Sequence, residues 1–368
     1  MAYFRKRGNK WYFTIEIGTG SKRQRKELAG GRTKAEAQAA YARAMVDLNT
    51  NGEYIEPTKK TLDQFAPEWL AEHSKNVKSN TIKSYTSIYR THISPAIGER
   101  QLRSIRPTTL QGLLNDKKLE GLAESTVSSI MAVLKKMFVY ASDFCEYIPK
   151  NPAQNIKMPS YVSAPKEVQT FSAEQIQIIF TNFPQGHQFY LPLAISYHTG
   201  ARFGECCALT WQDVDFDKME LSINKTVIQS GKELIVQDTP KTSHSFRTIP
   251  IGRKLIDILK REKRHQAISK LAGHGPNDNY IIHAKRGGIM GPNGIHFFNH
   301  CCKEWFGDGY SFHSMRHTHA TILLEAGEDL ELVSKRLGHG SMATTARVYS
   351  HVLDERKERS RHYLDNAL

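Results

Sequence analysis

Prolines divide the chain into segments that cannot share one continuous helix or strand. Pro57 follows a β-rich beginning, and a second group, Pro149, Pro152, Pro159 and Pro165, separates a helical stretch from a mixed region. Proline removes a backbone donor and fixes φ, so it is confined to the ends of regular elements. A single core also rarely holds 368 residues. The sequence predicts domains over 1–55, 61–155 and 171–368, with linkers over 56–60 and 156–170.

The first segment has the pattern of a small sheet covered by one helix. Trp11, Phe13, Ile15 and Ile17 alternate with polar or half-polar residues, which is the period of a half-buried strand. Thr33 and Glu36 have the spacing of a capping box, and an apolar stripe follows. We therefore expect a three-stranded β-sheet plus helix over residues 1–55.

Positive charge is concentrated in this first segment. The chain has 51 Lys and Arg against 37 Asp and Glu, and residues 1–60 contain 13 of the former against 6 of the latter. Such an excess favours a polyanionic partner, because cations that meet phosphates release condensed counterions. A β-ribbon can lie in a DNA groove, although a solvated basic face is the alternative. The candidate DNA-binding residues here are Arg5, Lys6, Arg7, Lys10, Lys22, Arg23, Arg25 and Lys26.

A membrane surface would attract the same charge, but the sequence gives no other sign of one. No run of 18 apolar residues is present, and Met1–Lys6 is not followed by an apolar signal core. The five cysteines, Cys145 and the adjacent pairs at 206–207 and 301–302, suit neither a disulfide framework nor a zinc site. We expect a cytoplasmic protein whose cysteines serve in packing.

Four helical stripes fill the second segment. They contain Phe65 and Trp69, then Tyr85 and Tyr89, then a leucine stripe over 110–114, then an apolar stripe over 127–141. Stripes of this period are core positions by default, so a four-helix domain is expected over 61–155. The lysines on the polar sides could meet phosphates, although a solvated lysine is the commoner case; they are Lys75, Lys78, Lys83, Lys135 and Lys136.

The third segment is mixed α/β and mostly helical. A capping box at Ser172 and Gln175 opens a helix, and an apolar helix runs from Tyr190 to the Thr199-Gly200 stop. Strand-like runs cover 219–226, 232–237 and 246–251. A helix over 253–270, a short strand at Tyr280–His283 and further helices complete the expected domain.

Polar residues recur in this segment beside turns and helix starts. Arg202 lies at the start of a helix with Glu205 three residues later, and Lys241 lies between two strand-like runs, as at a hairpin tip. His313 and Arg316 share a helical face at i, i+3. His339 follows a helix end within Gly-His-Gly, and Tyr349 comes ten residues later. Each motif alone is ordinary: a surface pair, an exposed charge, a helix-ending turn or packing.

Together these residues can form a site for phosphoryl transfer without a metal or another cofactor. Two guanidinium groups can hold the non-bridging oxygens of a phosphodiester and neutralise charge in the transition state. A lysine can protonate the departing sugar oxygen, and histidine can exchange a proton at the nucleophile. A tyrosine can make the covalent attack, and the bond energy kept in phosphotyrosine makes ATP unnecessary for rejoining.

The five motifs, in this order, resemble the tyrosine recombinase (phage integrase) family over essentially the whole chain. The resemblance implies that Arg202 and Arg316 clamp the phosphate and that Lys241 is the general acid for the 5′-oxygen. It implies that His313 handles protons and that His339 fills a position held by His or Trp. It further implies that Tyr349 becomes 3′-phosphotyrosyl-linked and that Glu205 supports the site.

The resemblance also implies what the other segments do. Residues 1–55 are similar to the domains that bind accessory arm sites in integrases of phages and conjugative elements, and 61–155 to a core-binding domain. Double-stranded DNA with core and arm attachment sites is then the expected partner, bound by a tetramer on paired sites. The helix near 354–364 is similar to segments that dock on a neighbouring protomer, with packing on its own domain as the alternative. An excisionase and a host DNA-bending protein are further expected partners.

Other interpretations of the site remain open. His313, His317 and His319 include an i, i+4 pair with zinc-ligand spacing, but no Glu follows His313 and Arg316 would oppose a cation. The carboxylates do not form a Mg²⁺-binding triad pattern, and no Walker A sequence is present. A DNA-binding regulator with this fold would make no covalent bond. A housekeeping dimer-resolving recombinase or a type IB topoisomerase would leave the basic N-terminal segment unexplained.

Overall fold

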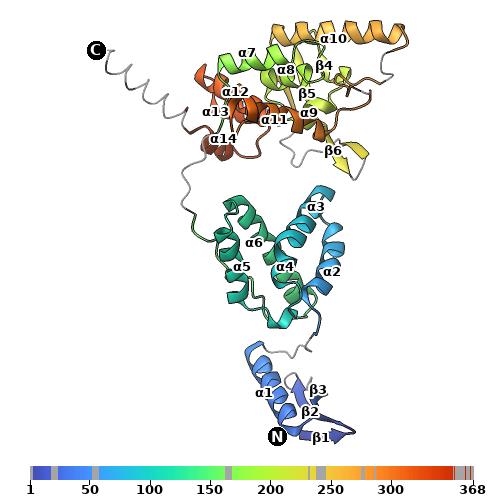
Figure 1. Cartoon of the computed structure of the whole chain (residues 1–368), viewed down its shortest axis with the longest axis vertical. Helices are drawn as coiled ribbons and strands as arrows, with labels where there is room; N and C mark the ends of the chain where they lie inside the picture. Colours follow the sequence, from blue (N-terminus) through green and yellow to red (C-terminus); the bar gives the residue numbers. More distant parts are fainter. Residues whose placement is uncertain are drawn as a thin grey trace. The chain divides into compact units, whose positions relative to one another are not determined.

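The computed structural model describes residues 3–17, 24–51, 58–161, 168–230, 233–237, 246–274, 278–285, 287–350, 352, 361 and 365. The chain divides into two compact units, residues 1–163 and 164–368, and this division falls inside the expected linker over 156–170. Figure 1 shows the order of the elements along the chain. The exact domain limits given above remain a prediction.

A three-stranded antiparallel sheet begins the N-terminal unit. Its strands are β1 (Tyr3–Arg7), β2 (Lys10–Ile17) and β3 (Gln24–Gly31), in the order β1-β2-β3, and α1 (Lys34–Asn51) follows. Phe13, Ile15 and Leu28 are buried with Ala44 of α1. The capping box forms as expected, because the Glu36 amide donates to Thr33 Oγ1 at 3.2 Å and the Thr33 amide donates to the Glu36 carboxylate at 3.2 Å. The predicted sheet and helix are confirmed.

A helical domain with its own core makes up the rest of this unit. Trp69, Phe65 and Phe138 are fully buried, so the apolar stripes are core as expected. The regular elements are α2 (Leu62–Ser74), α3 (Ser79–Ile88), the π-helical turn Tyr89–Ile93, α4 (Ser94–Ile97), the 3-10 turn Leu102–Ser104, α5 (Pro107–Leu119), α6 (Glu124–Val139) and the π-helical turn Tyr140–Phe144.

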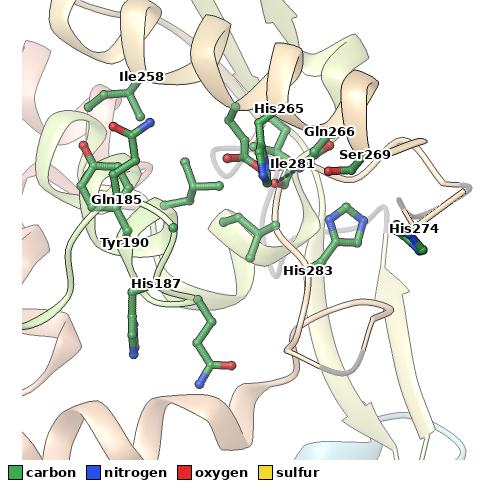
Figure 2. Close-up of a pocket in the computed structure, with 15 residues that line it drawn as sticks. Gln185, His187, Tyr190, Ile258, His265, Gln266, Ser269, His274, Ile281 and His283 are labelled. Carbon is green, nitrogen blue, oxygen red and sulfur yellow. Dashed lines mark hydrogen bonds and ion pairs between the residues drawn. The ribbon is translucent and has the colours of Figure 1, made fainter. Parts of the chain in front are cut away.

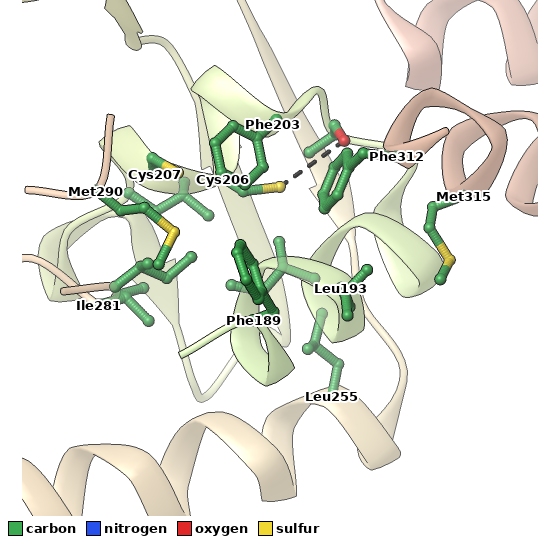
Figure 3. Close-up of a cluster of buried hydrophobic side chains, with 14 of the residues drawn as sticks. Phe189, Leu193, Phe203, Cys206, Cys207, Leu255, Ile281, Met290, Phe312 and Met315 are labelled. Carbon is green, nitrogen blue, oxygen red and sulfur yellow. Dashed lines mark hydrogen bonds between the residues drawn. The ribbon is translucent and has the colours of Figure 1, made fainter. Parts of the chain in front are cut away.

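The C-terminal unit packs helices around a small sheet. Phe189, Phe203, Phe312 and Cys206 belong to one large core cluster (Figure 3), where the two neighbouring cysteines serve as small buried side chains. The helices are α7 (Ala173–Asn182), α8 (Tyr190–Thr199), α9 (Phe203–Ala208), α10 (Arg253–Leu271), α11 (Ile295–Phe306), α12 (Phe312–Glu325), α13 (Leu330–Leu337) and α14 (Met342–Val348), with 3-10 turns at Trp211–Asp213 and Pro292–Gly294.

Of the three expected strand-like runs in this unit, those over 232–237 and 246–251 are confirmed and the run over 219–226 differs. They are β4 (Val214–Asp215), β5 (Glu220–Ile223), β6 (Thr226–Ser230), β7 (Glu233–Gln237) and β8 (Arg247–Pro250). The run over 219–226 is split between two sheets, since β5 pairs with β4 and β8 whereas β6 pairs with β7. Among the described residues, β7 and β8, the strands on either side of Lys241, belong to different sheets. The hairpin tip expected at Lys241 lies outside the described residues. The described residues contain a hairpin formed by β6 and β7.

Two further expectations concern short segments. Tyr280–His283 forms isolated bridges to Thr210 and Ile289 rather than a strand, because each end finds a single backbone partner. The expected helix near 354–364 lies almost entirely outside the described residues. Within the part of the chain that the structure describes, every helix is too short or too polar to cross a bilayer.

Candidate active site

Arg202 and Glu205 are held together at the start of α9. Arg202 is the N-cap of this helix, and its backbone amide donates to Glu205 Oε2 at 2.9 Å. Its Nη1 also donates to Glu205 Oε1 at 2.9 Å, while 41% of the Arg202 side chain stays exposed. The guanidinium is thus fixed at one edge and open to solvent at the other, as a group that receives an anion must be.

Arg316 is placed by backbone carbonyl groups at two helix ends. On α12 it is only 1% exposed, and its two terminal nitrogens donate to Gly200 O at 2.7 Å and Leu337 O at 2.5 Å. Gly200 ends α8 and Leu337 ends α13, where helix dipoles favour a cation. Burial and the charge of Arg202 lower the pKa of Arg316 to about 9, so the group remains charged at neutral pH.

Gly200 is required where α8 turns toward Arg202. Its φ of +70° is a left-handed conformation, and a Cβ there would lie 2.6 Å from Leu337 Cδ2 and 2.9 Å from His319 Cδ2. Glycine meets both demands because it lacks a Cβ. The turn after α8 can therefore approach α12 and α13 closely and bring Arg202 near Arg316.

The positive charges of Arg202 and Arg316 contribute to lowering the pKa of both His313 and His339. Desolvation by the surrounding chain and the charges of Arg316 and Arg202 lower the pKa of His313 to about 4. Burial and the same two charges lower the pKa of His339 to about 4, and His339 Nδ1 is paired with Thr345 Oγ1 at 2.8 Å. Both imidazoles are therefore neutral at pH 7.

Tyr349 lies inside a small apolar cluster next to these histidines. The side chain is 0% exposed and packs with Ala320, Val333 and Leu337. Its hydroxyl is 2.9 Å from His317 Nδ1, and the rings of His317 and His313 are 4.7 Å apart in an edge arrangement. Burial raises the pKa of Tyr349 to about 12, against a smaller lowering by the charge of Arg316. The phenol is near the arginines but closed to solvent.

Two further residues of the site have roles that the sequence does not indicate. The spacing of His317 suggests only a metal ligand, although it pairs with the Tyr349 hydroxyl. No motif singles out Arg247 on β8, although its Nη2 donates to Glu205 Oε2 at 2.7 Å and its side chain is 5% exposed. The position of His317 directly after Arg316 is the one available signal. The contacts of Arg247 depend on chain pairing that no local pattern reveals.

The geometry argues against the zinc alternative. His319 donates from Nδ1 to Tyr197 O at 2.8 Å and accepts from Arg336 Nε at 2.9 Å, so both ring nitrogens are used. The Arg316 charge lies close enough to lower the pKa of His313 and His317. Over the described ranges, no group of three or more His, Cys, Asp or Glu residues is arranged to hold a metal ion.

A separate polar pocket lies on the same unit between the start of α8 and α10. Figure 2 shows that Gln185, His187, Tyr190, His265 and His283 are among the residues that line it. Of the predicted catalytic residues that the structure describes, none lines this pocket. The structure thus gathers Arg202, Glu205, His313, Arg316, His339 and Tyr349 elsewhere, while Lys241 lies outside the described residues.

The predicted DNA-binding cations lie on exposed faces. Arg5, Lys6, Arg7, Lys10, Arg25 and Lys26 are exposed on the N-terminal sheet, whereas Lys22 and Arg23 lie outside the described residues. Arg7 and Arg25 make exposed ion pairs with Glu27 and Glu16. In the helical domain Lys78, Lys83 and Lys136 are exposed and Lys135 is half-buried, with Lys136 Nζ 5.3 Å from the centre of the Tyr85 ring.

Comparison with known proteins finds relatives over nearly the whole chain. Residues 167–356 match the Phage integrase family, and residues 61–118 match the phage integrase N-terminal SAM-like domain. A tyrosine recombinase XerC-like protein of Caldanaerobacter subterraneus is 30% identical over 96% of this chain and 95% of its own. The ICEBs1 integrase of Bacillus subtilis is 28% identical over 82% of this chain and 81% of its own.

Solved structures share the fold at lower identity. The Tn1549 transposon integrase in complex with a circular intermediate DNA matches with a TM-score of 0.66 and 20% identity, covering 81% of this chain and 99% of that one. A lambda integrase dimer bound to a core site matches with a TM-score of 0.58 and 18% identity, covering 94% of this chain and 93% of that one.

Proposed function

The chain belongs to the phage integrase family, and from this membership we propose that it is the integrase of a mobile element, joined covalently to DNA through Tyr349. As a tyrosine recombinase it is an enzyme that cleaves and rejoins DNA. Relatives include an integrase of Bacillus subtilis that is similar over 82% of this chain. The roles of the individual residues are our inference from the geometry.

Two arginines of different exposure would clamp the scissile phosphate. Arg202 presents a partly exposed guanidinium, and Arg316 is fixed by two carbonyl groups at helix ends. Guanidinium forks bind non-bridging phosphate oxygens in a bidentate manner. Because the protein already orients both groups, little reorganisation accompanies the growth of negative charge in the transition state.

Tyr349 would supply the attacking oxygen. Its phenolic oxygen forms a bond to phosphorus while the bond from phosphorus to the 5′-oxygen breaks. The phenolic proton passes to a neutral imidazole, for which His313 is the candidate, and Lys241 protonates the departing 5′-oxygen. The reverse reaction, with a 5′-hydroxyl as the nucleophile, rejoins the strand without ATP.

The observation that carries this assignment is a pair of buried hydrogen bonds. Arg316 donates to Gly200 O, two residues before Arg202, and to Leu337 O, two residues before His339. Three separate segments of the chain, which contain Arg202, Arg316 and His339, therefore lie close together. A suicide substrate nicked near the cleavage site tests the chemistry. Wild-type protein should form a covalent adduct with DNA, and Tyr349→Phe should form none at equal DNA binding. If wild type forms no adduct on its own attachment site, the regulator alternative holds.

The exposed cations of the N-terminal sheet support an integrase rather than a dimer-resolving enzyme. We infer that residues 1–55 bind arm sites, that 61–155 and 171–368 bind the core site, and that a tetramer acts on paired sites in the cytoplasm. Deleting residues 1–55 should spare cleavage of core-site DNA and abolish retention of arm-site DNA in a gel shift. Unchanged arm-site retention would favour the resolving enzyme.

A further inference from the structure

Arg247 is a buried cation at the start of β8, outside the set of residues that the sequence predicts to be catalytic. Its backbone pairs with Ile223 of β5, and its side chain is 5% exposed. A buried guanidinium is costly unless its donors are satisfied. The partners that satisfy Arg247 are therefore informative about why it is there.

The hydrogen bonds that Arg247 donates to Glu205 connect it indirectly to Arg202. Arg247 Nη2 donates to Glu205 Oε2 at 2.7 Å, and Nη1 lies 3.4 Å from Oε1. The same carboxylate accepts from the backbone amide and the Nη1 of Arg202. Glu205 is thus shared between the two arginines, and its orientation depends on Arg247 as much as on Arg202.

A further hydrogen bond, from Arg247 to the end of α13, connects it indirectly to Arg316. Arg247 Nε donates to the carbonyl oxygen of Arg336 at 2.7 Å. The next carbonyl along the chain, that of Leu337, accepts from Arg316 at 2.5 Å. Because these carbonyl groups belong to successive residues in the last turn of α13, a shift of one displaces the other.

We propose that Arg247 is a positioning residue that orients both phosphate-clamping arginines at once. It holds Arg202 through Glu205, and it holds Arg316 through the last turn of α13. A single rigid fork thereby sets the spacing between two groups that must reach one phosphate. This inference rests on the proposed function, since it concerns the same reaction.

The test compares two substrates in the same protein. Arg247→Met keeps much of the length of the side chain and removes the fork, so we expect single-turnover cleavage of normal core-site DNA to slow about 100-fold. In a substrate with a methylphosphonate at the scissile position, a methyl group replaces one non-bridging oxygen and removes its charge. Cleavage of that substrate depends less on a matched pair of arginines, so Arg247→Met should lose less than about 10-fold relative to wild type.

The ratio of the rate losses on the two substrates distinguishes a positioning role of Arg247 from a loss of folded protein. A reduced folded fraction lowers the rate on both substrates by the same factor, and it therefore cancels in the ratio. Arg247→Lys keeps the charge but cannot reach Glu205 and Arg336 together, so it should show the same pattern with a smaller loss. Arg253→Met, the same substitution at an exposed position, should behave as wild type on both substrates.

Each outcome has one meaning. If Arg247→Met and Arg247→Lys lose equal factors on both substrates, or lose nothing, Arg247 does not position the arginines. If Arg247→Met does not fold, the ratio for Arg247→Lys decides. A wild-type protein that forms no adduct contradicts the proposed function itself, and this result is visible before any variant is compared.

Discussion

Arginine side chains at the two ends of the chain stand in opposite surroundings. Those of the N-terminal sheet, such as Arg7 and Arg25, are 55% and 79% exposed and pair with exposed carboxylates. In the C-terminal unit, by contrast, Arg316 and Arg247 are almost completely buried and are fixed by carbonyl groups or by Glu205. Exposed cations attract DNA and are screened by salt, whereas buried, oriented cations act on one phosphate.

Replacing one arginine from each region should give the largest difference in cleavage rate between the buried and the exposed arginines. Arg316→Ala removes an oriented charge, so we expect single-turnover cleavage to fall about 1,000-fold while core-site affinity changes less than about threefold. Arg5→Ala should leave cleavage unchanged. Cleavage assays and gel shifts on the same DNA measure both effects. A matched loss of affinity would make Arg316 an ordinary phosphate anchor.

Lys241 extends the comparison to a cation with a chemical role. Lys241→Ala should slow cleavage of normal DNA about 100-fold, because the 5′-oxygen leaves without a proton. A 5′-bridging phosphorothiolate should relieve this defect, since the sulfur leaves readily as a thiolate. Single-turnover rates on the two substrates give the answer. Equal impairment on both would contradict the general-acid role.

The carboxylates that pair with arginines should differ in what they contribute to stability. Two arginines hold the pKa of Glu205 at about 2 against the opposing effect of burial, so its ionised form stabilises the fold above an unfolded pKa near 4.5. Glu205→Gln should lower the free energy of unfolding by about 3 kcal/mol at pH 7. Glu16→Gln, on the exposed pair with Arg25, should cost less than about 1 kcal/mol.

The pH dependence fixes the sign of the Glu205 effect. The difference between wild type and Glu205→Gln should be constant above about pH 5.5 and shrink as the pH falls from about 5 toward 2. Urea denaturation of the full chain at several pH values measures it. A difference that grows on acidification would show that Glu205 is not held ionised by its partners.

The smallest effect concerns the exposed cations. Replacing Arg5, Lys6, Arg7 and Lys10 together by Gln should weaken arm-site binding and flatten its salt dependence, by about 0.9 in slope for each DNA phosphate that is no longer neutralised. Core-site cleavage should not change. Binding titrations at several salt concentrations test this, and an unchanged slope would mean that these residues do not meet DNA phosphates.

Local signals in the sequence located much of the fold. The capping box at Ser172 and Gln175 marks the start of α7, and Thr199-Gly200 marks the end of α8. These predictions succeed because capping and helix termination depend on residues only a few positions apart. The strand pairing around Lys241 was not predictable in this way, because β8 pairs with β5 across more than twenty residues of chain.

The candidate site likewise contains residues that the sequence indicates and contacts that it does not. The motif residues could be chosen from sequence because their chemistry and order are recognisable. The pairing of His317 with Tyr349 and of Arg247 with Glu205 joins residues 32 and 42 positions apart. Such contacts arise only when the helices and β8 have packed, so no periodicity in the sequence indicates them.

The closed position of Tyr349 has a consequence for the safety of the cell. A phenol that is 0% exposed and paired with His317 is out of reach of any phosphodiester. If Tyr349 is the nucleophile, as proposed, we therefore expect the free chain to bind chromosomal DNA without nicking it. Cleavage would then be limited to complexes in which the Tyr349 hydroxyl becomes exposed.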